Sequence, residues 1–180
     1  MSITYALMLF RAETQQRELP VLGQIHNFEL FDEEGREFTL NKLSGEIWIA
    51  NFFFTTCGDI CPIMSKNMAA LHRTFEQIEG VKFVSITVNP EMDSSPVLKK
   101  YADKFKANTD RWHFLTGPRA QITDLAINSF KLGAIEEPVF HSAKFTLVDR
   151  HGMIRGYYDG VQAGEVSQLF KDVTQLLKER

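Results

Sequence analysis

Cys57 and Cys61 are the two cysteines of this chain, and they lie four positions apart. They follow the apolar run 47–54 and precede a helical pattern, so a strand is expected to end just before the first sulfur. A helix N-terminus supplies positive potential, which favours the thiolate over the thiol. Because the thiolate attacks disulfides and binds metals, this placement indicates redox or metal chemistry.

The spacing of Cys57 and Cys61 is compatible with both kinds of chemistry. Residues four apart share one face of a helix, with Cβ atoms about 5–6 Å apart, whereas a disulfide needs about 3.5–4.5 Å. A small adjustment of the helix start, helped by Gly58, closes that gap, so the pair can be oxidised. The same spacing lets both sulfurs point at one metal ion. Two thiolates favour Cu(I), or zinc when further ligands join.

A third ligand is expected from His141, which precedes the predicted strand 143–148. That strand is expected to run antiparallel to the Cys57 strand, so its beginning lies at the end of the sheet where the cysteines lie. Two thiolates and one imidazole suit trigonal Cu(I) and accept Cu(II) with an added ligand. Of the other histidines, we expect a solvated His72, a partly buried His113, a His151 at the far end of the sheet, and a His26 that cannot be placed.

Three further residues near the cysteines are expected to have structural roles. Met64 and Met68 are soft sulfur donors, but their spacing on an apolar helical stripe predicts core packing rather than metal binding. Asp59, between the two cysteines, is expected to cap the helix that follows.

The predicted elements follow a regular order. Alternation and turn residues predict a hairpin over 24–40. The near-continuous apolar run 47–53 is typical of a strand covered on both faces. Helical stripes and breakers then predict the remaining helices and strands: helix 60–78, strand 81–88, a helix opened by Ser94, strand 112–115, a helix opened by Gly117, strands 143–148 and 153–158, and a final helix with apolar positions from Val166 to Leu177.

This order predicts one α/β domain of three layers. Alternating β-α units give parallel strands, and the tight turn 149–152 gives an antiparallel pair. The plan is that of a thioredoxin-like fold with an N-terminal β-hairpin extension. In such sheets the functional edge lies at the carboxyl ends of the parallel strands, which is where Cys57 is expected.

Composition and charge limit the classes of protein to which this chain can belong. A chain of 180 residues suits one domain, and a net charge of -3 gives no basic excess for nucleic acid. Residues 1–10 are apolar but shorter than the ~20 residues of a membrane span. They read either as a short docked helix or as the end of a membrane anchor. We therefore divide the chain into a tether, 1–19, and a thioredoxin-like domain, 20–180.

Four segments of the sequence together resemble the SCO/SenC family: NFFFTTCGDICPIM (51–64), SITVNPEMDSSPVLKKY (85–101), WHFLTG (112–117) and HSAKFTLVDRHGMIRGYYDG (141–160). Proteins of this family are thioredoxin-like, copper-binding assembly factors for the copper centre of cytochrome c oxidase. The resemblance implies that Cys57, Cys61 and His141 match the family's copper ligands. It also implies a periplasmic protein tethered to the membrane, with the copper-bearing oxidase subunit or another copper acceptor as its partner.

Several functions remain open at this point. The first is a copper metallochaperone, and the second is a thiol–disulfide oxidoreductase that acts on the oxidase subunit or another periplasmic partner. In the second, Cys57 attacks, Cys61 resolves the mixed disulfide, and a thioredoxin-like protein supplies the electrons. A peroxidase is a weaker third reading, because no Arg adjoins Cys57 in sequence. Gly58, Asn89 and Phe140 stand where the family commonly has other residues, and they leave the choice between copper delivery and redox work open.

Overall fold

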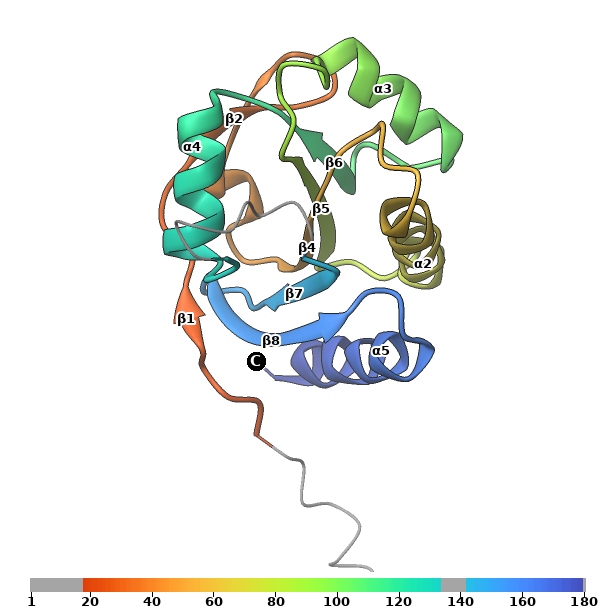
Figure 1. Cartoon of the computed structure of the whole chain (residues 1–180). Coiled ribbons are helices and arrows are strands. Elements are labelled where there is room, and N and C mark those ends of the chain that lie inside the picture. The colour runs from red at the N-terminus through yellow and green to blue at the C-terminus, as the bar shows by residue number, and fades with distance from the viewer. Residues whose placement is uncertain (1–17, 134–141, 180) are drawn as a thin grey trace, which may run out of the picture.

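The computed structural model describes residues 18–133 and 142–179, and within them a six-stranded sheet forms the centre of the molecule (Figure 1). The strand order is β1-β8-β7-β4-β5-β6. The strands are β1 (Gly23–Gln24), β4 (Ile47–Phe53), β5 (Val81–Thr87), β6 (Trp112–Leu115), β7 (Lys144–Val148) and β8 (Met153–Asp159).

Strand β4 is central, and all seven of its residues are buried. It runs parallel to β5, with Ile47 opposite Val81, and antiparallel to β7, with Ala50 opposite Thr146. The continuous apolar run is explained by burial on both faces. The beginning of β7 therefore lies at the same end of the sheet as the end of β4.

Helices cover both faces of the sheet (Figure 1). On one face, α2 (Ile60–Thr74), α3 (Ser95–Lys104) and α5 (Ala163–Lys178) bury their apolar stripes against alternate residues of β4 and β5. The opposite face packs against α4 (Arg119–Asp124), its π-helical continuation η2 (Leu125–Ser129) and the 3-10 turn η1 (Leu40–Leu43). This packing produces two hydrophobic cores, one on each side of the sheet. The thioredoxin-like α/β architecture is confirmed.

The N-terminal hairpin is present but shorter than the predicted range 24–40. It consists of β2 (Glu29–Phe31) and β3 (Glu37–Thr39), whereas β1 joins the main sheet beside β8. The hairpin covers the open edge of β6, because the Glu33 carboxylate accepts a hydrogen bond from the Phe114 backbone N–H at 2.8 Å. One N–H group of this strand edge, which would otherwise be unpaired, is thereby satisfied.

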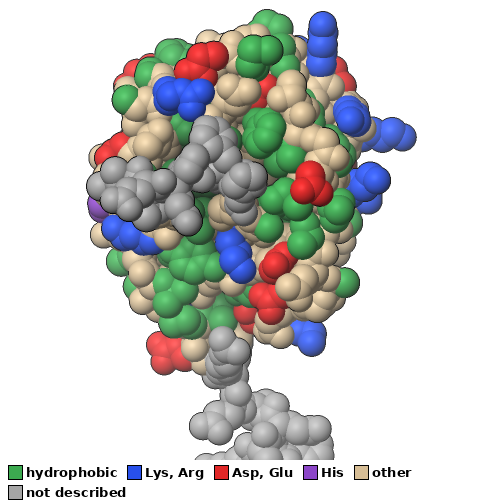
Figure 2. Space-filling view, viewed as in Figure 1, with side chains coloured by type: hydrophobic (Ala, Val, Ile, Leu, Met, Phe, Trp, Pro, Cys, Tyr) green, Lys and Arg blue, Asp and Glu red, His purple; other side chains and the backbone are tan. Residues whose placement is uncertain are grey.

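Helix α2 is also shorter than its predicted range 60–78, because it ends at Thr74 and the chain turns through Phe75. Gly80 then adopts a positive φ of 83°, a conformation that favours glycine, immediately before β5. None of the helices in the described residues is both long and apolar enough for a membrane span. On the face seen in Figure 2, Lys and Arg side chains are interspersed with Asp and Glu side chains.

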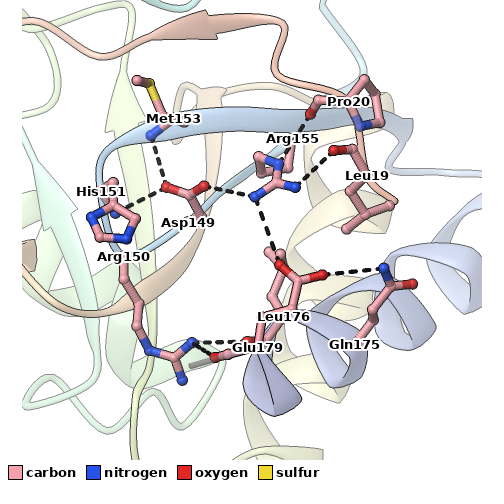
Figure 3. Close-up of polar contacts among 10 residues, drawn as sticks. All are labelled: Leu19, Pro20, Asp149, Arg150, His151, Met153, Arg155, Gln175, Leu176 and Glu179. Atoms are coloured by element: carbon pink, nitrogen blue, oxygen red, sulfur yellow. Dashed lines mark hydrogen bonds and ion pairs between the residues drawn. The ribbon is translucent and has the colours of Figure 1, made fainter. Parts of the chain in front are cut away.

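A polar network closes the β7–β8 turn (Figure 3). The largely buried carboxylate of Asp149 accepts hydrogen bonds from the backbone N–H groups of His151 (2.9 Å) and Met153 (3.0 Å). It also accepts one from the Arg155 guanidinium at 2.8 Å. The Gly45 N–H donates to the Arg150 carbonyl at 3.2 Å, so this turn lies beside the start of β4. The network is therefore at the end of the sheet opposite Cys57.

Arg155 also fastens the segment through which the chain enters the domain. Its guanidinium donates to the carbonyls of Leu19 (2.7 Å) and Pro20 (3.0 Å), as Figure 3 shows. Nearby, the Arg150 guanidinium donates to the carbonyl of Leu176 at 2.8 Å, close to the end of α5. The two arginines thus hold both ends of the domain against the β7–β8 turn.

Arg155→Leu is expected to lower the free energy of unfolding by about 1–3 kcal/mol, because it leaves the mostly buried Asp149 carboxylate without its cationic partner. Urea denaturation measures this change. Lys99→Ala serves as the control, because the Lys99–Glu34 ion pair is exposed and removing it is expected to cost less than about 1 kcal/mol. Equal effects of the two substitutions would contradict the structural role of Arg155.

Candidate metal centre

Cys57 and Cys61 lie where β4 gives way to α2. The chain turns after Phe53, and the Cys57 N–H donates to the Phe54 carbonyl at 3.3 Å. Cys61 falls in the first turn of α2 and is only 4% exposed, whereas Cys57 is half-buried. Both are free thiols, and their side chains are hydrogen-bonded to each other. The predicted pairing at the carboxyl end of β4 is therefore present.

The start of α2 explains why Cys57 ionises more easily than an ordinary cysteine. Burial opposes ionisation of this thiol, but hydrogen bonds from the Asp59 backbone, the Cys61 thiol and the backbone of Cys61 and Ile60 outweigh it. The pKa of Cys57 is consequently lowered. Asp59 was predicted to cap the helix, and this prediction was wrong, because its side chain makes no capping hydrogen bond. The Cys57 sulfur accepts from the first N–H groups instead.

Cys61 has the opposite electrostatic environment. Burial raises its pKa, and the neighbouring Cys57 raises it further. The negative charge of Asp93 acts in the same direction, while a hydrogen bond with the Phe54 backbone opposes it. The pair therefore holds one thiolate readily at Cys57 and keeps the inner thiol protonated. A soft cation that binds both sulfurs displaces the second proton.

Asp93 holds the cysteine loop in place, a role that no local sequence pattern indicated. Its carboxylate is fully buried, at 0% exposed. It accepts hydrogen bonds from the Thr55 backbone N–H (3.0 Å), the Thr55 hydroxyl (2.5 Å) and the Thr87 hydroxyl (2.5 Å). Thr55 lies two residues before Cys57 and Thr87 ends β5. One carboxylate thus joins the ends of the two central strands beneath the cysteine loop.

Asp93→Asn is expected to lower the free energy of unfolding by about 1–3 kcal/mol, because the amide replaces an acceptor oxygen with a donor and leaves a buried donor unpaired. Urea denaturation of the reduced protein measures the change. Glu91→Gln is the matched control, because Glu91 is an exposed acid two residues away. A loss for Asp93→Asn no larger than that of the control would contradict the role of Asp93 as a clamp.

Of the described histidines, His113 and His151 lie as predicted and His72 does not. His72 was expected to be solvated, but it is 2% exposed and packs between the rings of Phe83 (5.5 Å) and Trp112 (5.6 Å). Burial lowers its pKa, so it forms part of the core as a neutral ring. It lies four residues after the buried Met68, on the same helix face, which explains the burial.

His113 is a partly buried structural residue, as predicted. Its ring lies 4.6 Å from that of Phe38, and burial lowers its pKa to about 4. His26 and His151 are exposed, and His151 lies in the β7–β8 turn far from the cysteines. His141 lies outside the described residues.

Met64 and Met68 lie in the hydrophobic core, which confirms their predicted packing role. Across residues 18–133 and 142–179, no three His, Cys, Asp or Glu side chains gather closely enough to hold a metal ion. This part of the chain therefore contributes two candidate ligands, Cys57 and Cys61, at one rim of the sheet.

Comparison with known proteins relates this arrangement to one family. The SCO1/SenC family model matches residues 17–178. A SCO1/SenC family lipoprotein from Bacillus anthracis has 29% identity and a TM-score of 0.80, covering 90% of this chain and 99% of the other. BsSco, described as a member of the Sco family of cytochrome c oxidase assembly proteins with a disulfide switch, has 31% identity, a TM-score of 0.80 and coverage of 92% and 100%. Copper-bound yeast Sco1 has 26% identity, a TM-score of 0.71 and coverage of 91% and 96%.

Proposed function

The chain belongs to the SCO1/SenC family, and on this basis we propose that it is a copper metallochaperone for the copper centre of cytochrome c oxidase. The observation that carries the proposal is the pair of free thiols Cys57 and Cys61, which interact with each other at the start of α2. Copper-bound yeast Sco1 supports copper as the metal, and BsSco supports oxidase assembly as the context.

The cysteine pair suits copper as a transferable cargo. Two thiolates are soft ligands that favour Cu(I). Cys57 is the more accessible sulfur and the more readily ionised one, so an incoming or departing copper ion is expected to meet it first. Cys61 is buried and closes the inner side of the site. Copper leaves by ligand exchange, in which each Cu–S bond breaks as a bond to the acceptor forms.

His141 is the proposed third ligand. The support comes from Ala143, two residues further along the chain. Ala143 packs against the same hydrophobic cluster as Cys57, and its carbonyl accepts a hydrogen bond from the Gly160 N–H at 2.6 Å. Ala143 directly precedes β7, and because β7 runs antiparallel to β4 it begins at the end of the sheet where β4 ends. This position of the β7 start supports His141 as a ligand from the same end of the sheet as the cysteines.

The oxidation state of the cysteines controls loading. Joining the two sulfurs in a disulfide removes two electrons and two protons and abolishes both thiolate ligands. A thioredoxin-like reductant that returns two electrons and two protons restores the binding form.

The same chemistry supports the second candidate function, a thiol–disulfide oxidoreductase, which the lowered pKa and partial exposure of Cys57 favour. Cys57 would attack a partner disulfide, and Cys61 would then release the reduced partner from the mixed disulfide.

A copper titration of the reduced protein separates the two functions. The metallochaperone is expected to bind one equivalent of Cu(I) in competition with a chelator, and the oxidised protein is expected to bind none. The rate at which the reduced protein cleaves a small disulfide is measured in parallel. Rapid cleavage with negligible copper uptake would reject the metallochaperone in favour of the oxidoreductase.

We further propose that the domain, 20–180, is held at the periplasmic face of the membrane by the tether, 1–19. The Bacillus anthracis relative described as a lipoprotein supports membrane association. Arg155 holds the carbonyls of Leu19 and Pro20 at the end of the sheet opposite Cys57. A tether that continues from Leu19 would thus leave the domain far from the copper site. Fractionation of cells is expected to place the protein with the membranes, and recovery from the cytoplasm would contradict this location.

A further inference from the structure

The turn between β5 and α3 is fastened to the cysteine loop. The Val88 N–H donates to the carbonyl of Phe53, the last residue of β4, at 2.8 Å. Asp93 accepts hydrogen bonds from both the backbone and the hydroxyl of Thr55, two residues before Cys57. The turn and the cysteine loop therefore form one connected rim at the end of the sheet.

The outer side of this turn is held by a second contact. The Arg119 guanidinium donates to the Glu91 carboxylate at 2.8 Å and to the Val88 carbonyl at 3.3 Å. Within the turn, the N–H groups of Met92 (3.1 Å) and Asp93 (2.9 Å) both donate to the Asn89 carbonyl. The backbone that carries Met92 is consequently fixed from both sides.

The Met92 side chain does not take part in packing. It is 61% exposed, whereas Met64 and Met68 are buried in the core. A thioether normally fills irregular gaps in a core, so an exposed one on a rigid turn is free for other contacts. Both carboxylates of the turn are engaged, Glu91 by Arg119 and Asp93 by the two threonines. The sulfur of Met92 is therefore the soft donor that this turn presents to solvent.

We propose that Met92 is an accessory thioether ligand that holds Cu(I) briefly as the metal enters or leaves the Cys57–Cys61 site. This inference rests on the proposed copper function and extends it. Met92 adjoins Asp93, and Cys57 follows Thr55 by two residues, so the clamp between Asp93 and Thr55 keeps the segments that carry Met92 and Cys57 on one rim. A methionine side chain has three rotatable bonds, so an exposed one samples a range of positions along this rim.

Transfer of copper through Met92 requires no redox step. A thioether selects Cu(I), and because it carries no charge it is expected to bind the ion less tightly than a thiolate does. As copper leaves, a Cu–S bond to Cys57 breaks while a bond to the Met92 sulfur forms, and the copper remains Cu(I). The freed thiolate then takes a proton from water or stays ionised. The acceptor's own ligand displaces Met92 in the next exchange.

Two measurements on the whole chain test this relay. In protein labelled with ¹³C at the methionine methyl groups, added Cu(I) is expected to shift or broaden the Met92 signal while the copper exchanges with a chelator. The Met153 signal is expected to stay unchanged, because Met153 lies beside the β7–β8 turn at the far end of the sheet. Met92→Leu is expected to slow transfer of Cu(I) to bathocuproine disulfonate by roughly five-fold, a barrier increase of about 1 kcal/mol.

Met153→Leu is the matched control and is expected to transfer copper at the wild-type rate. A Met92 methyl signal that is insensitive to Cu(I), or a Met92→Leu variant that transfers copper as fast as the wild type, would overturn the relay. Failure of the underlying copper function gives a different result, because the wild-type protein itself would then not bind one equivalent of Cu(I).

Discussion

Cys61→Ser abolishes tight Cu(I) binding if both sulfurs are ligands, and Cys57→Ser has the same effect. A serine hydroxyl is a hard donor that stays protonated, so each substitution removes one of two soft ligands. Substitutions of residues that only support a metal ligand lower the affinity by up to about 100-fold. Because Cys57 and Cys61 are themselves the proposed ligands, the expected loss of Cu(I) affinity exceeds about 100-fold. Competition with a Cu(I) chelator under anaerobic conditions measures the affinity of each reduced variant.

Thr56→Ser is the matched control, because Thr56 is an exposed residue of the same loop. It is expected to keep wild-type copper affinity, which shows that a small side-chain change in the loop does not by itself disturb the site. Thermal unfolding of all variants checks that they fold. A folded single-cysteine variant that still competes as well as the wild type would refute the paired-thiolate site.

His141→Ala is expected to produce the second largest effect, the loss or severe weakening of Cu(II) binding. Cu(II) prefers nitrogen ligands more strongly than Cu(I) does, so removal of the imidazole affects the oxidised metal most. The intensity of the thiolate-to-copper charge-transfer absorption measures Cu(II) binding. Disulfide formation between Cys57 and Cys61 is expected to remain intact, because it does not involve the imidazole.

His151→Ala controls for the loss of an imidazole elsewhere on the protein. His151 is exposed in the β7–β8 turn, at the opposite end of the sheet, so its removal is expected to leave the absorption unchanged. Unchanged Cu(II) affinity in His141→Ala would show that the site has a different third ligand.

The sequence predicted the sheet and the cysteine position because local patterns decide them. The run that forms β4 is apolar at almost every position, and this continuous pattern indicates burial on both faces. Cys57 follows that run directly, so the end of the strand fixed its place in the fold. The resemblance to the SCO/SenC family, carried by four separate segments, is confirmed by the family match over 17–178.

Interactions between distant segments were not predictable in this way. Asp93 and Thr55 are 38 positions apart, and no local pattern shows that a carboxylate after β5 bonds a threonine after β4. The burial of His72 was missed because the residue was assigned to the helix face that follows Leu71, although its spacing from Met68 places it on the buried face. The capping role assigned to Asp59 failed because the Cys57 sulfur occupies the N–H groups at the start of α2.

X-ray absorption spectroscopy of the protein loaded with one equivalent of Cu(I) tests the copper site most directly. The proposed ligands predict a first coordination shell of two sulfurs and one imidazole nitrogen, with one sulfur lost in Cys61→Ser and the nitrogen lost in His141→Ala. A wild-type shell with fewer than two sulfurs, or one that stays the same in both variants, would contradict the site formed by Cys57, Cys61 and His141.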